Sequence, residues 1–429
     1  MLPELSESQR NWVEDTLNSM TMEERVGHLL CPEDRNYTAE EWRELLHKVP
    51  LGCVFFGGDS RPALLKKARA VQSASRIPVM IAADMEHGAV AIKTEATRFP
   101  VPMACAATQS PELLFKLGRI TALESRSCGI HWTFSPVADL NLNLNNPLVN
   151  VRSLGDDPDR VAPLLQAFIR GLQHEGLMAA TVKHFPGDGV DDRDQHLCTT
   201  VNSLPVDQWM ELYGRVWQAA FDAGVMSVMV GHIAFPDWQK TVPEESLPAT
   251  LCSAIQTDLL RKRLGFDGLT VSDAVPMIGL TSRCVDEELA WRNIASGSDV
   301  VLFSKPIDDF KHLMNALRCG KLSEQRVMDA VRHILTVKAL LNLPQDPFGS
   351  AMTAALLADH DKVADEIAGK AISQVKSRVG LLPVKLSSGA KVLTITVTEK
   401  DHQNEVKDLP EIDEELRLRG FQVDHLLNP

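Results

Sequence analysis

Short apolar runs alternate with longer amphipathic stretches over most of the chain, and this alternation limits the possible fold more than any other feature. Each run is four to eight residues long and almost entirely apolar, which is typical of strands covered on both faces. The eight runs are 26–31, 51–56, 78–83, 131–135, 178–184, 226–232, 268–272 and 299–303. Between them we expect helices, among them 110–124, 159–174, 206–223 and 286–296. Eight strands alternating with helices predict an α/β protein whose residues 1–345 form a (β/α)₈ barrel of the TIM type.

The first run has a second interpretation, because residues 26–31 can equally be the end of a helix. Thr21 and Glu24 form the spacing of a capping box, in which each side chain accepts a hydrogen bond from the other residue's backbone. This pattern predicts that a helix begins just after Thr21.

The pattern changes after residue 345. We predict a long helix over 351–376, followed by a strand at 391–397, a charged helix at 405–418 and a strand at 421–425. One β-α-β unit has too little core to fold alone. We therefore expect residues 346–390 to form a helical linker and 391–429 a partial α/β second domain.

The charge and cysteine content exclude several classes of protein. The chain has 44 Lys and Arg against 57 Asp and Glu, a formal charge of −13, which argues against binding to nucleic acid or an anionic membrane. The start of the chain lacks the basic and apolar segments of a signal peptide, so we expect a cytoplasmic protein. The eight cysteines are scattered without a C-x-x-C pair, and we expect small buried side chains, not a zinc site.

Polar residues follow one predicted strand after another, at the ends where barrel enzymes carry their catalytic groups. The densest segment is 183–196, KHFPGDGVDDRDQH. An acidic solvated loop is the alternative interpretation. We favour a functional loop because the segment directly continues a buried strand that ends in Lys183 and His184.

Asp273 lies at the tip of the apolar run 268–272. A carboxylate there can act as a nucleophile or stabilise a cation, or it can cap the next helix, and the residues alone leave both interpretations open. Single histidines such as His184 and His232 also occur in metal-dependent barrel hydrolases. Because no predicted strand carries the paired H-x-H ligands of those enzymes, we expect neither a metal nor another cofactor.

The segment KHFPGDGVDDRDQH resembles the signature of glycoside hydrolase family 3, in particular its bacterial β-N-acetylglucosaminidase branch. Further segments are similar to motifs of that family in the same order along the chain. They are MTMEERVG at 20–27, DME at 84–86, FSPVAD at 134–139, VRSLG at 151–155 and GFDGLTVSD at 265–273.

The resemblance implies a retaining two-step hydrolysis, with Asp273 as the nucleophile. It also implies that His196 is the general acid and base and that Asp194 orients it. Imidazole suits this double role because it titrates near neutral pH. The residues expected to bind the sugar are Asp84, Arg152, Lys183 and His184.

The chain departs from the family pattern at His87, Ala89 and Ala274, where the family has glycine, arginine and commonly aspartate. These changes leave the nucleophile and the dyad in place. The end of the chain resembles the start of the family's second, sandwich domain, and a dyad on the barrel implies that catalysis does not require that domain. Hydrolysis of terminal β-linked N-acetylglucosamine is our first hypothesis, with a small carbohydrate as the partner. A phosphorylase, another family 3 β-glycosidase and a non-catalytic sugar-binding protein are the alternatives.

Overall fold

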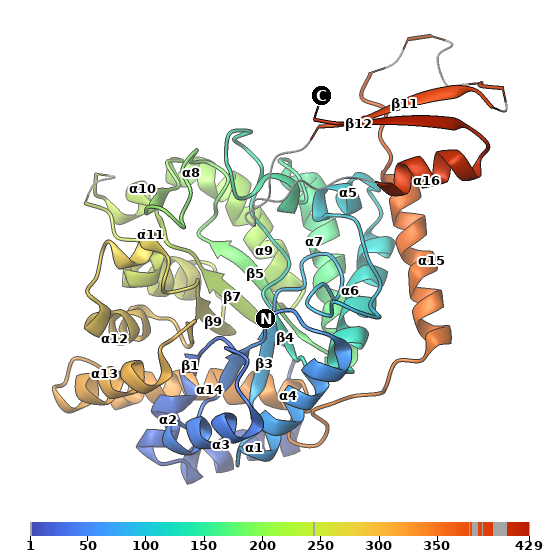
Figure 1. Cartoon of the computed structure of the whole chain (residues 1–429). Helices are drawn as coiled ribbons and strands as arrows, with labels where there is room; N and C mark the ends of the chain where they lie inside the picture. The colour runs from blue at the N-terminus through green and yellow to red at the C-terminus, as the bar shows by residue number, and fades with distance from the viewer. Residues whose placement is uncertain are drawn as a thin grey trace. The chain divides into compact units, whose positions relative to one another are not determined.

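The computed structural model describes residues 2–242, 245–376, 378–379, 385–387, 389–397 and 410–428. The chain divides into two compact units, Met1–Ile372 and Ser373–Pro429. In the first unit, strands run through the middle and helices lie outside them (Figure 1). No helix of the described residues is both long and apolar enough to cross a bilayer.

Eight parallel strands of the first unit correspond to the eight predicted apolar runs, and one of them ends a residue beyond its run, at Phe185. They are β1 (Leu30–Cys31), β2 (Cys53–Phe55), β3 (Met80–Ala83), β4 (Trp132–Thr133), β5 (Ala179–Phe185), β7 (Ser227–Val230), β9 (Leu269–Ser272) and β10 (Val301–Leu302). Six of them form one parallel sheet in the order β2-β3-β4-β5-β7-β9, and β1 pairs with β10. The fold is therefore α/β with a parallel sheet, and closure of all eight strands into one barrel stays a prediction.

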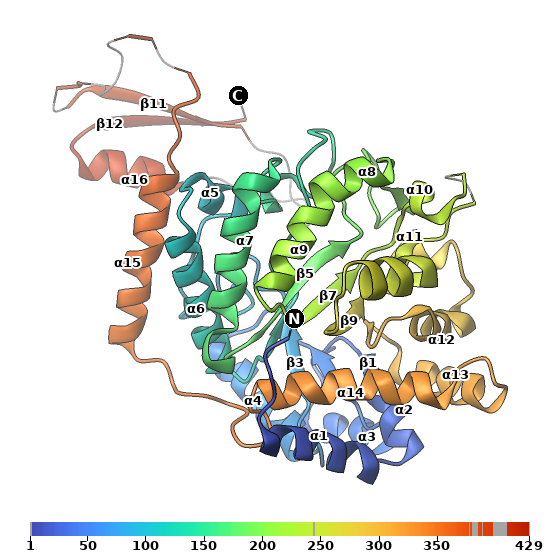
Figure 2. The same ribbon diagram turned by 180° about the vertical axis from the view of Figure 1, so that it is seen from behind.

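The helices surround these strands. Figure 2 shows α6, α7 and α9 side by side on the outside of the sheet. The helices of the first unit are α1 (Glu7–Ser19), α2 (Met22–His28), α3 (Ala39–Lys48), α4 (Arg61–Ser73), α5 (Pro102–Ala107), α6 (Pro111–Arg126), α7 (Pro158–Leu172), α8 (Val206–Trp209), α9 (Arg215–Asp222), α10 (Pro236–Gln239), α11 (Ile278–Thr281), α12 (Asp286–Ser296), α13 (Pro306–Arg318), α14 (Glu324–Leu340) and α15 (Ala354–Ala371). All four helices named from the sequence are present, although π-helical turns interrupt the one at 206–223.

The first half of the first apolar run forms the end of a helix, as the second interpretation of that run predicted. The Thr21 hydroxyl oxygen accepts the Glu24 N–H at 3.2 Å, and the Glu24 carboxylate accepts the Thr21 N–H at 2.9 Å. This capping box starts α2, which continues to His28 and leaves only Leu30 and Cys31 for β1.

The first unit extends further along the chain than we predicted. Helix α15 packs against α5 and α6, and the His360 Nδ1 atom lies 2.8 Å from the buried Glu124 carboxylate of α6. The predicted helical linker at 346–390 is therefore corrected, because α15 contributes its buried face, including Ala364 and Ile367, to the first unit.

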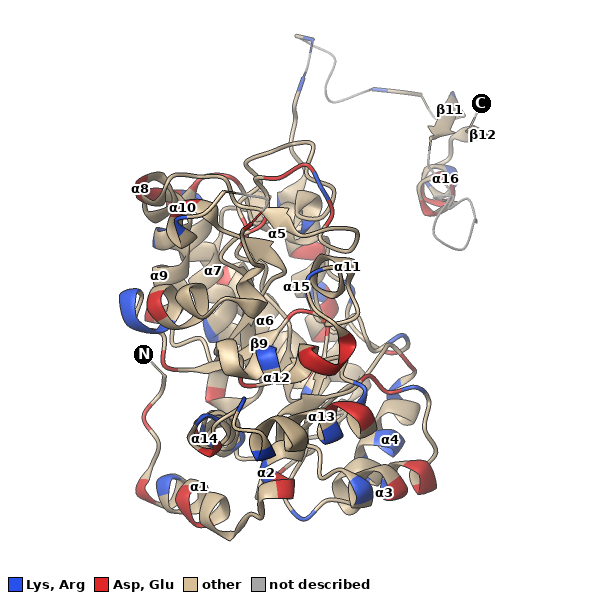
Figure 3. Cartoon of the chain, turned by 90° about the vertical axis from the view of Figure 1, so that its left-hand side faces the viewer, with Lys and Arg blue, Asp and Glu red and all other residues tan. Residues whose placement is uncertain are grey.

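The second unit contains the predicted β-α-β pattern. Strands β11 (Lys391–Thr396) and β12 (Gln422–Leu427) pair in parallel, and α16 (Pro410–Leu418) precedes β12. The first residues of the predicted helix, 405–409, lie outside the described residues. In the view of Figure 3, the helices of the first unit carry both acidic and basic residues.

Candidate active site

The carboxyl ends of the parallel strands surround a cavity of about 320 Å³, within the size range of small-ligand sites. Side chains at the ends of β3, β4, β5, β7, β9 and β10 all contribute to its wall. The lining residues are Asp84, Phe134, Arg152, Lys183, His184, Gln195, His196, Met229, Asp273, Ala274, Met277, Leu302 and Phe303. Every site residue predicted from the sequence is among them except Asp194, which is hydrogen-bonded to His196 but does not itself line the cavity.

Asp273 directly follows β9 and is 8% exposed. Its backbone N–H donates to Val230 O at 2.8 Å, and its Oδ1 atom accepts the Ala274 N–H at 2.8 Å. Its Oδ2 atom is buried and has no hydrogen-bond partner among the residues that the structure describes. One carboxylate oxygen is thus held by the backbone, and the other is free to form a bond.

The charge of Asp273 is stabilised by its neighbours. Burial alone would raise the pKa of Asp273, but the nearby His184 and His232 imidazoles and the Ala274 N–H outweigh it, so the pKa lies below its ordinary value. The His184 Nε2 atom is 4.0 Å from Asp273 Oδ2. Asp273 is therefore ionised near neutral pH, as a carboxylate nucleophile must be.

His184 is held by Asp139, a buried residue that follows β4. The Asp139 carboxylate lies 2.7 Å from His184 Nδ1 and accepts the His184 backbone N–H at 3.1 Å. It also accepts the Asp188 N–H at 2.8 Å. An Nδ1–H bonded to this carboxylate turns Nε2 toward Asp273. We did not predict a role for Asp139, although it is the last residue of the FSPVAD motif, in the loop after β4.

A buried group of charges forms the wall beside β3. The Lys183 ammonium lies 2.8 Å from Glu86 and 3.2 Å from Asp84. Arg152 donates two hydrogen bonds to the Glu86 carboxylate, at 2.7 and 2.9 Å. Burial would raise the pKa of Glu86, but Lys183 and Arg152 outweigh it and keep this carboxylate ionised. Glu86 thus fixes both cations, whereas the Asp84 side chain stays 52% exposed and can accept hydrogen bonds from a ligand.

Sequence reasoning missed the role of Glu86. The signal was the D-x-E spacing just after β3, because side chains two residues apart in an extended segment point to the same side of it.

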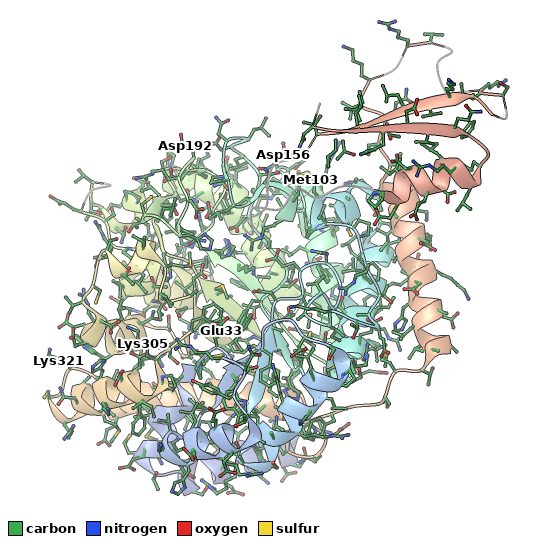
Figure 4. All side chains as sticks on the ribbon, viewed as in Figure 1. Glu33, Met103, Asp156, Asp192, Lys305 and Lys321 are labelled. Carbon is green, nitrogen blue, oxygen red and sulfur yellow. The ribbon has the colours of Figure 1, made fainter. Side chains whose placement is uncertain are left out.

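Asp194 and His196 form a closely bonded dyad on the loop after β5. The Asp194 Oδ1 atom lies 2.7 Å from His196 Nδ1 and accepts the His196 backbone N–H at the same distance. The His196 side chain is 57% exposed. Because Nδ1 faces the carboxylate, Nε2 is left for a ligand. Figure 4 shows the neighbouring loop residue Asp192 at the same rim of the molecule as Asp156.

Apolar side chains complete the wall of the cavity, namely Phe134, Met229, Met277, Leu302 and Phe303. A sugar ring has apolar C–H faces as well as hydroxyl groups, so a wall with both kinds of side chain suits it. His87 and Ala89, where the chain departs from the family pattern, are not among the described residues that line this cavity.

Comparison with known proteins is consistent with this site. Residues 21–337 match the model of the glycosyl hydrolase family 3 N terminal domain. A "Beta-N-acetylglucosaminidase/beta-glucosidase" of Cellulomonas fimi is 37% identical over 391 residues, which are 89% of this chain and 69% of that protein.

Two solved structures are similar over nearly the whole chain. "Beta-glucoside phosphorylase BglX" superposes with a TM-score of 0.88 at 32% identity and covers 98% of this chain and 77% of its own. A glycoside hydrolase family 3 β-N-acetylglucosaminidase from Paenibacillus sp. str. FPU-7 has a TM-score of 0.86 at 27% identity, covering 95% and 80%. The matched segment contains all the residues that line the cavity, and the chain belongs to glycosyl hydrolase family 3.

Proposed function

We propose that the chain is a retaining exo-β-N-acetylglucosaminidase, which releases terminal β-linked N-acetylglucosamine through a glycosyl-enzyme intermediate. The observation that carries this proposal is that Asp273 Oδ2, without a hydrogen-bond partner among the described residues, lies in the same cavity as His196, which Asp194 holds. A buried ionised carboxylate and an imidazole that can give and take a proton are the two groups that the reaction requires.

In the first step, Asp273 Oδ2 attacks the anomeric carbon while the bond from that carbon to the leaving oxygen breaks. His196 gives its Nε2 proton to the leaving oxygen. In the second step, water attacks the same carbon, His196 Nε2 takes the proton of the water, and the bond to Asp273 breaks. Two displacements restore the original β configuration. Asp194 stabilises the imidazolium and keeps its Nδ1–H directed away from the substrate.

The sugar is held by the groups next to Asp273. Lys183 and Arg152 are donors only and suit hydroxyl oxygens, whereas Asp84 can accept two hydroxyl protons. His184 completes this set beside the reacting carbon. Because Glu86 and Asp139 hold the cations and the imidazole, these groups need little reorganisation when substrate binds.

The proposal includes a closed barrel as the scaffold. Single parallel bridges, Glu33 with Phe55 and Val271 with Val300, support closure because they lie between β1 and β2 and between β9 and β10. Closure would place the ends of all eight strands around one cavity.

Phosphorolysis is the second candidate. A protein named as a β-glucoside phosphorylase superposes over 98% of this chain, and the proposed acid here is an imidazole. A neutral or cationic imidazole repels an incoming phosphate less than a carboxylate would. In that reaction phosphate replaces water in the second step, and sugar 1-phosphate is released.

Aryl β-glycosides that differ at C2 test these proposals, with wild type, Asp273→Asn and His196→Ala compared in the presence and absence of phosphate. We expect β-N-acetylglucosaminide to be the better substrate and both variants to be impaired. Preference for β-glucoside would contradict the substrate assignment, and sugar 1-phosphate as the main product would favour phosphorolysis. Full activity of His196→Ala on a substrate with a poor leaving group would contradict the mechanism.

A further inference from the structure

Gln195, between the two members of the dyad, is buried although its neighbours are exposed. The Gln195 residue is 1% exposed, whereas the side chains of Asp194 and His196 are 27% and 57% exposed. Its Oε1 atom accepts the backbone N–H of His232 at 3.2 Å. A polar side chain that turns inward on an otherwise solvated loop fixes that loop to the interior.

His232 connects this contact to the nucleophile. Its imidazole is fully buried, with Nε2 donating to Ala274 O at 2.9 Å and Nδ1 lying 3.0 Å from the Thr250 hydroxyl. A carbonyl oxygen can only accept, so Nε2 carries a proton. The residue after Asp273 is thus joined through His232 to the residue before His196.

A second set of contacts joins the same loop to α11, which begins five residues after Asp273. The Gln195 and His196 carbonyls accept the Gly279 and Ile278 N–H groups, each at 3.2 Å, and the Thr199 hydroxyl donates to Gly279 O at 2.7 Å. Beyond the loop, β6 (Thr200–Val201) pairs with β8 (Ile233–Ala234), just after His232. Residues 195–201 of this chain segment are held by the segments that follow β7 and β9.

Gly279 makes this close approach possible. A Cβ atom on Gly279 would lie 2.4 Å from Gln195 O and 2.9 Å from Cys198 O. Both are backbone atoms, which cannot move aside as the end of a side chain can. Any larger residue at position 279 would push the dyad loop away from the nucleophile segment.

We propose that Gln195 and Gly279 are positioning residues, which fix the His196 imidazole at the distance from Asp273 that protonation of the leaving oxygen requires. The inference rests on the proposed function and deepens it. A general acid acts only from hydrogen-bonding distance of the oxygen it protonates. Loss of the Gln195 contact should therefore impair acid catalysis more than it impairs the attack of Asp273.

The test uses Gln195→Met, which keeps the length and volume of the side chain but removes the acceptor oxygen. Gln72→Met is the matched control, because Gln72 Oε1 also accepts a backbone N–H, that of Val79 at 3.0 Å, away from the cavity. The readout is kcat/KM for two aryl β-N-acetylglucosaminides, one with a poor and one with a good leaving group. This parameter reports the first chemical step, in which a poor leaving group requires the acid.

For Gln195→Met we expect kcat/KM to fall about 10-fold to 100-fold with the poor leaving group and less than about threefold with the good one, as part of the roughly 10²–10⁴-fold effect of a general acid. Gln72→Met should leave both values within about twofold of wild type. Gly279→Ala should repeat the leaving-group effect. Its control, Gly369→Ala, adds a methyl group where no atom lies within 4 Å and should have no effect.

An equal fall with both substrates would overturn the inference, because it would mean a sugar contact or a general loss of structure. Unchanged values for Gln195→Met and Gly279→Ala would overturn it as well. These outcomes differ from failure of the proposed function, in which wild type itself would not cleave the substrates or Asp273→Asn would remain fully active.

Discussion

At the scale of single residues, the site depends on carboxylates that hold other groups in place. Asp139 orients His184, Glu86 holds Lys183 and Arg152, and Asp194 is bonded to His196. Each pair joins a carboxyl group to a basic side chain, which is the kind of hydrogen bond that is stronger than a neutral one. The side chains that face the cavity are thereby oriented before a sugar enters it.

The Asp194–His196 pair gives a prediction at this scale. Asp194→Ala should lower kcat/KM for a poor leaving group by about 100-fold or more, because the imidazole loses both its orientation and the partner that stabilises its cation. The measurement is steady-state hydrolysis of an alkyl β-N-acetylglucosaminide.

Asp192→Ala is the control for Asp194→Ala. It removes the same charge from the same loop, but Asp192 is exposed and pairs with no imidazole in the contacts described (Figure 4). We expect less than about a twofold change for it. Equal losses in both variants would mean that loop charge, not orientation of His196, matters.

A buried carboxyl group, Asp188, gives a second prediction. Burial and the neighbouring Asp139 raise the pKa of Asp188 from 3.8 to about 6, and no described residue forms a hydrogen bond with its Oδ2 atom. The unfolded chain loses this proton at lower pH than the folded chain. The stability that this carboxyl group contributes is fully present below its pKa in the unfolded chain. It is lost as pH rises through about 6, the pKa in the folded chain.

Asp188→Asn removes this pH dependence and keeps an acceptor for the Asn146 amide. We expect it to raise the free energy of unfolding by roughly 1–3 kcal/mol at pH 8 and to have little effect at pH 4. Urea unfolding at the two pH values measures this. A gain of the same size at both would contradict the explanation.

Polar residues at strand ends indicated where the site would lie, and the family resemblance supplied the individual residues, six of which line one cavity. Glu86 and Asp139 were not predicted, because their partners, Lys183 and His184, lie 97 and 45 residues away and only the fold brings each pair together. Gln195 gave no signal at all, since a glutamine in an acidic loop is ordinarily solvated.

At the scale of elements, the apolar runs predicted eight of the strands described in the first unit, but not the short pair β6 and β8. Their lengths were not predicted, because several runs contribute only two paired residues, as in β1 and β4. The capping box at Thr21 fixes the start of α2, and this helix continues into the first run. Local caps and hydrogen-bond register decide such boundaries, and neither is visible in an apolar pattern.

Helix α14 contains a fully buried lysine, a residue type that is ordinarily exposed. Lys338 is fully buried, and in the part of the chain that the structure describes its ammonium has no hydrogen-bond partner. Burial lowers the pKa of Lys338 from 10.5 to about 8, and Cys53 opposes this only in part. When pH falls from the pKa of Lys338 in the unfolded chain through about 8, the unfolded chain takes up the proton before the folded chain does. The folded protein therefore loses stability over this pH range.

Lys338→Met should therefore stabilise the protein by roughly 1–3 kcal/mol near pH 7, with a smaller gain near pH 10. Urea unfolding at both pH values measures the difference. Lys311→Met on α13 is the control, because the Lys311 side chain is 68% exposed and should show no such pH dependence. A loss of stability in Lys338→Met near pH 7 would contradict this view of the buried ammonium.

At the scale of the whole molecule, every residue that lines the cavity belongs to the first unit. The sequence predicted that the chain changes character after residue 345, but α15 still contributes buried residues to the first unit. The predicted boundary was misplaced because the amphipathic pattern of α15 does not tell which element the buried face of this helix will contact.

We predict that a chain ending at Ile372 retains kcat/KM within about twofold of the full chain, because it contains the proposed nucleophile, the dyad and the sugar-binding groups. The measurement is hydrolysis of an aryl β-N-acetylglucosaminide by both chains, with circular dichroism to establish that the shorter chain is folded. A folded but inactive shorter chain would show that the second unit contributes to catalysis.

The most direct test of the central claim is mass spectrometry of the protein after incubation with a 5-fluoro-β-N-acetylglucosaminyl fluoride, which slows breakdown of a glycosyl-enzyme intermediate. The mechanism predicts one sugar residue attached to the peptide that contains Asp273, and no adduct in Asp273→Asn. An adduct on a different carboxylate, or an unmodified wild-type protein that nevertheless releases fluoride, would contradict it.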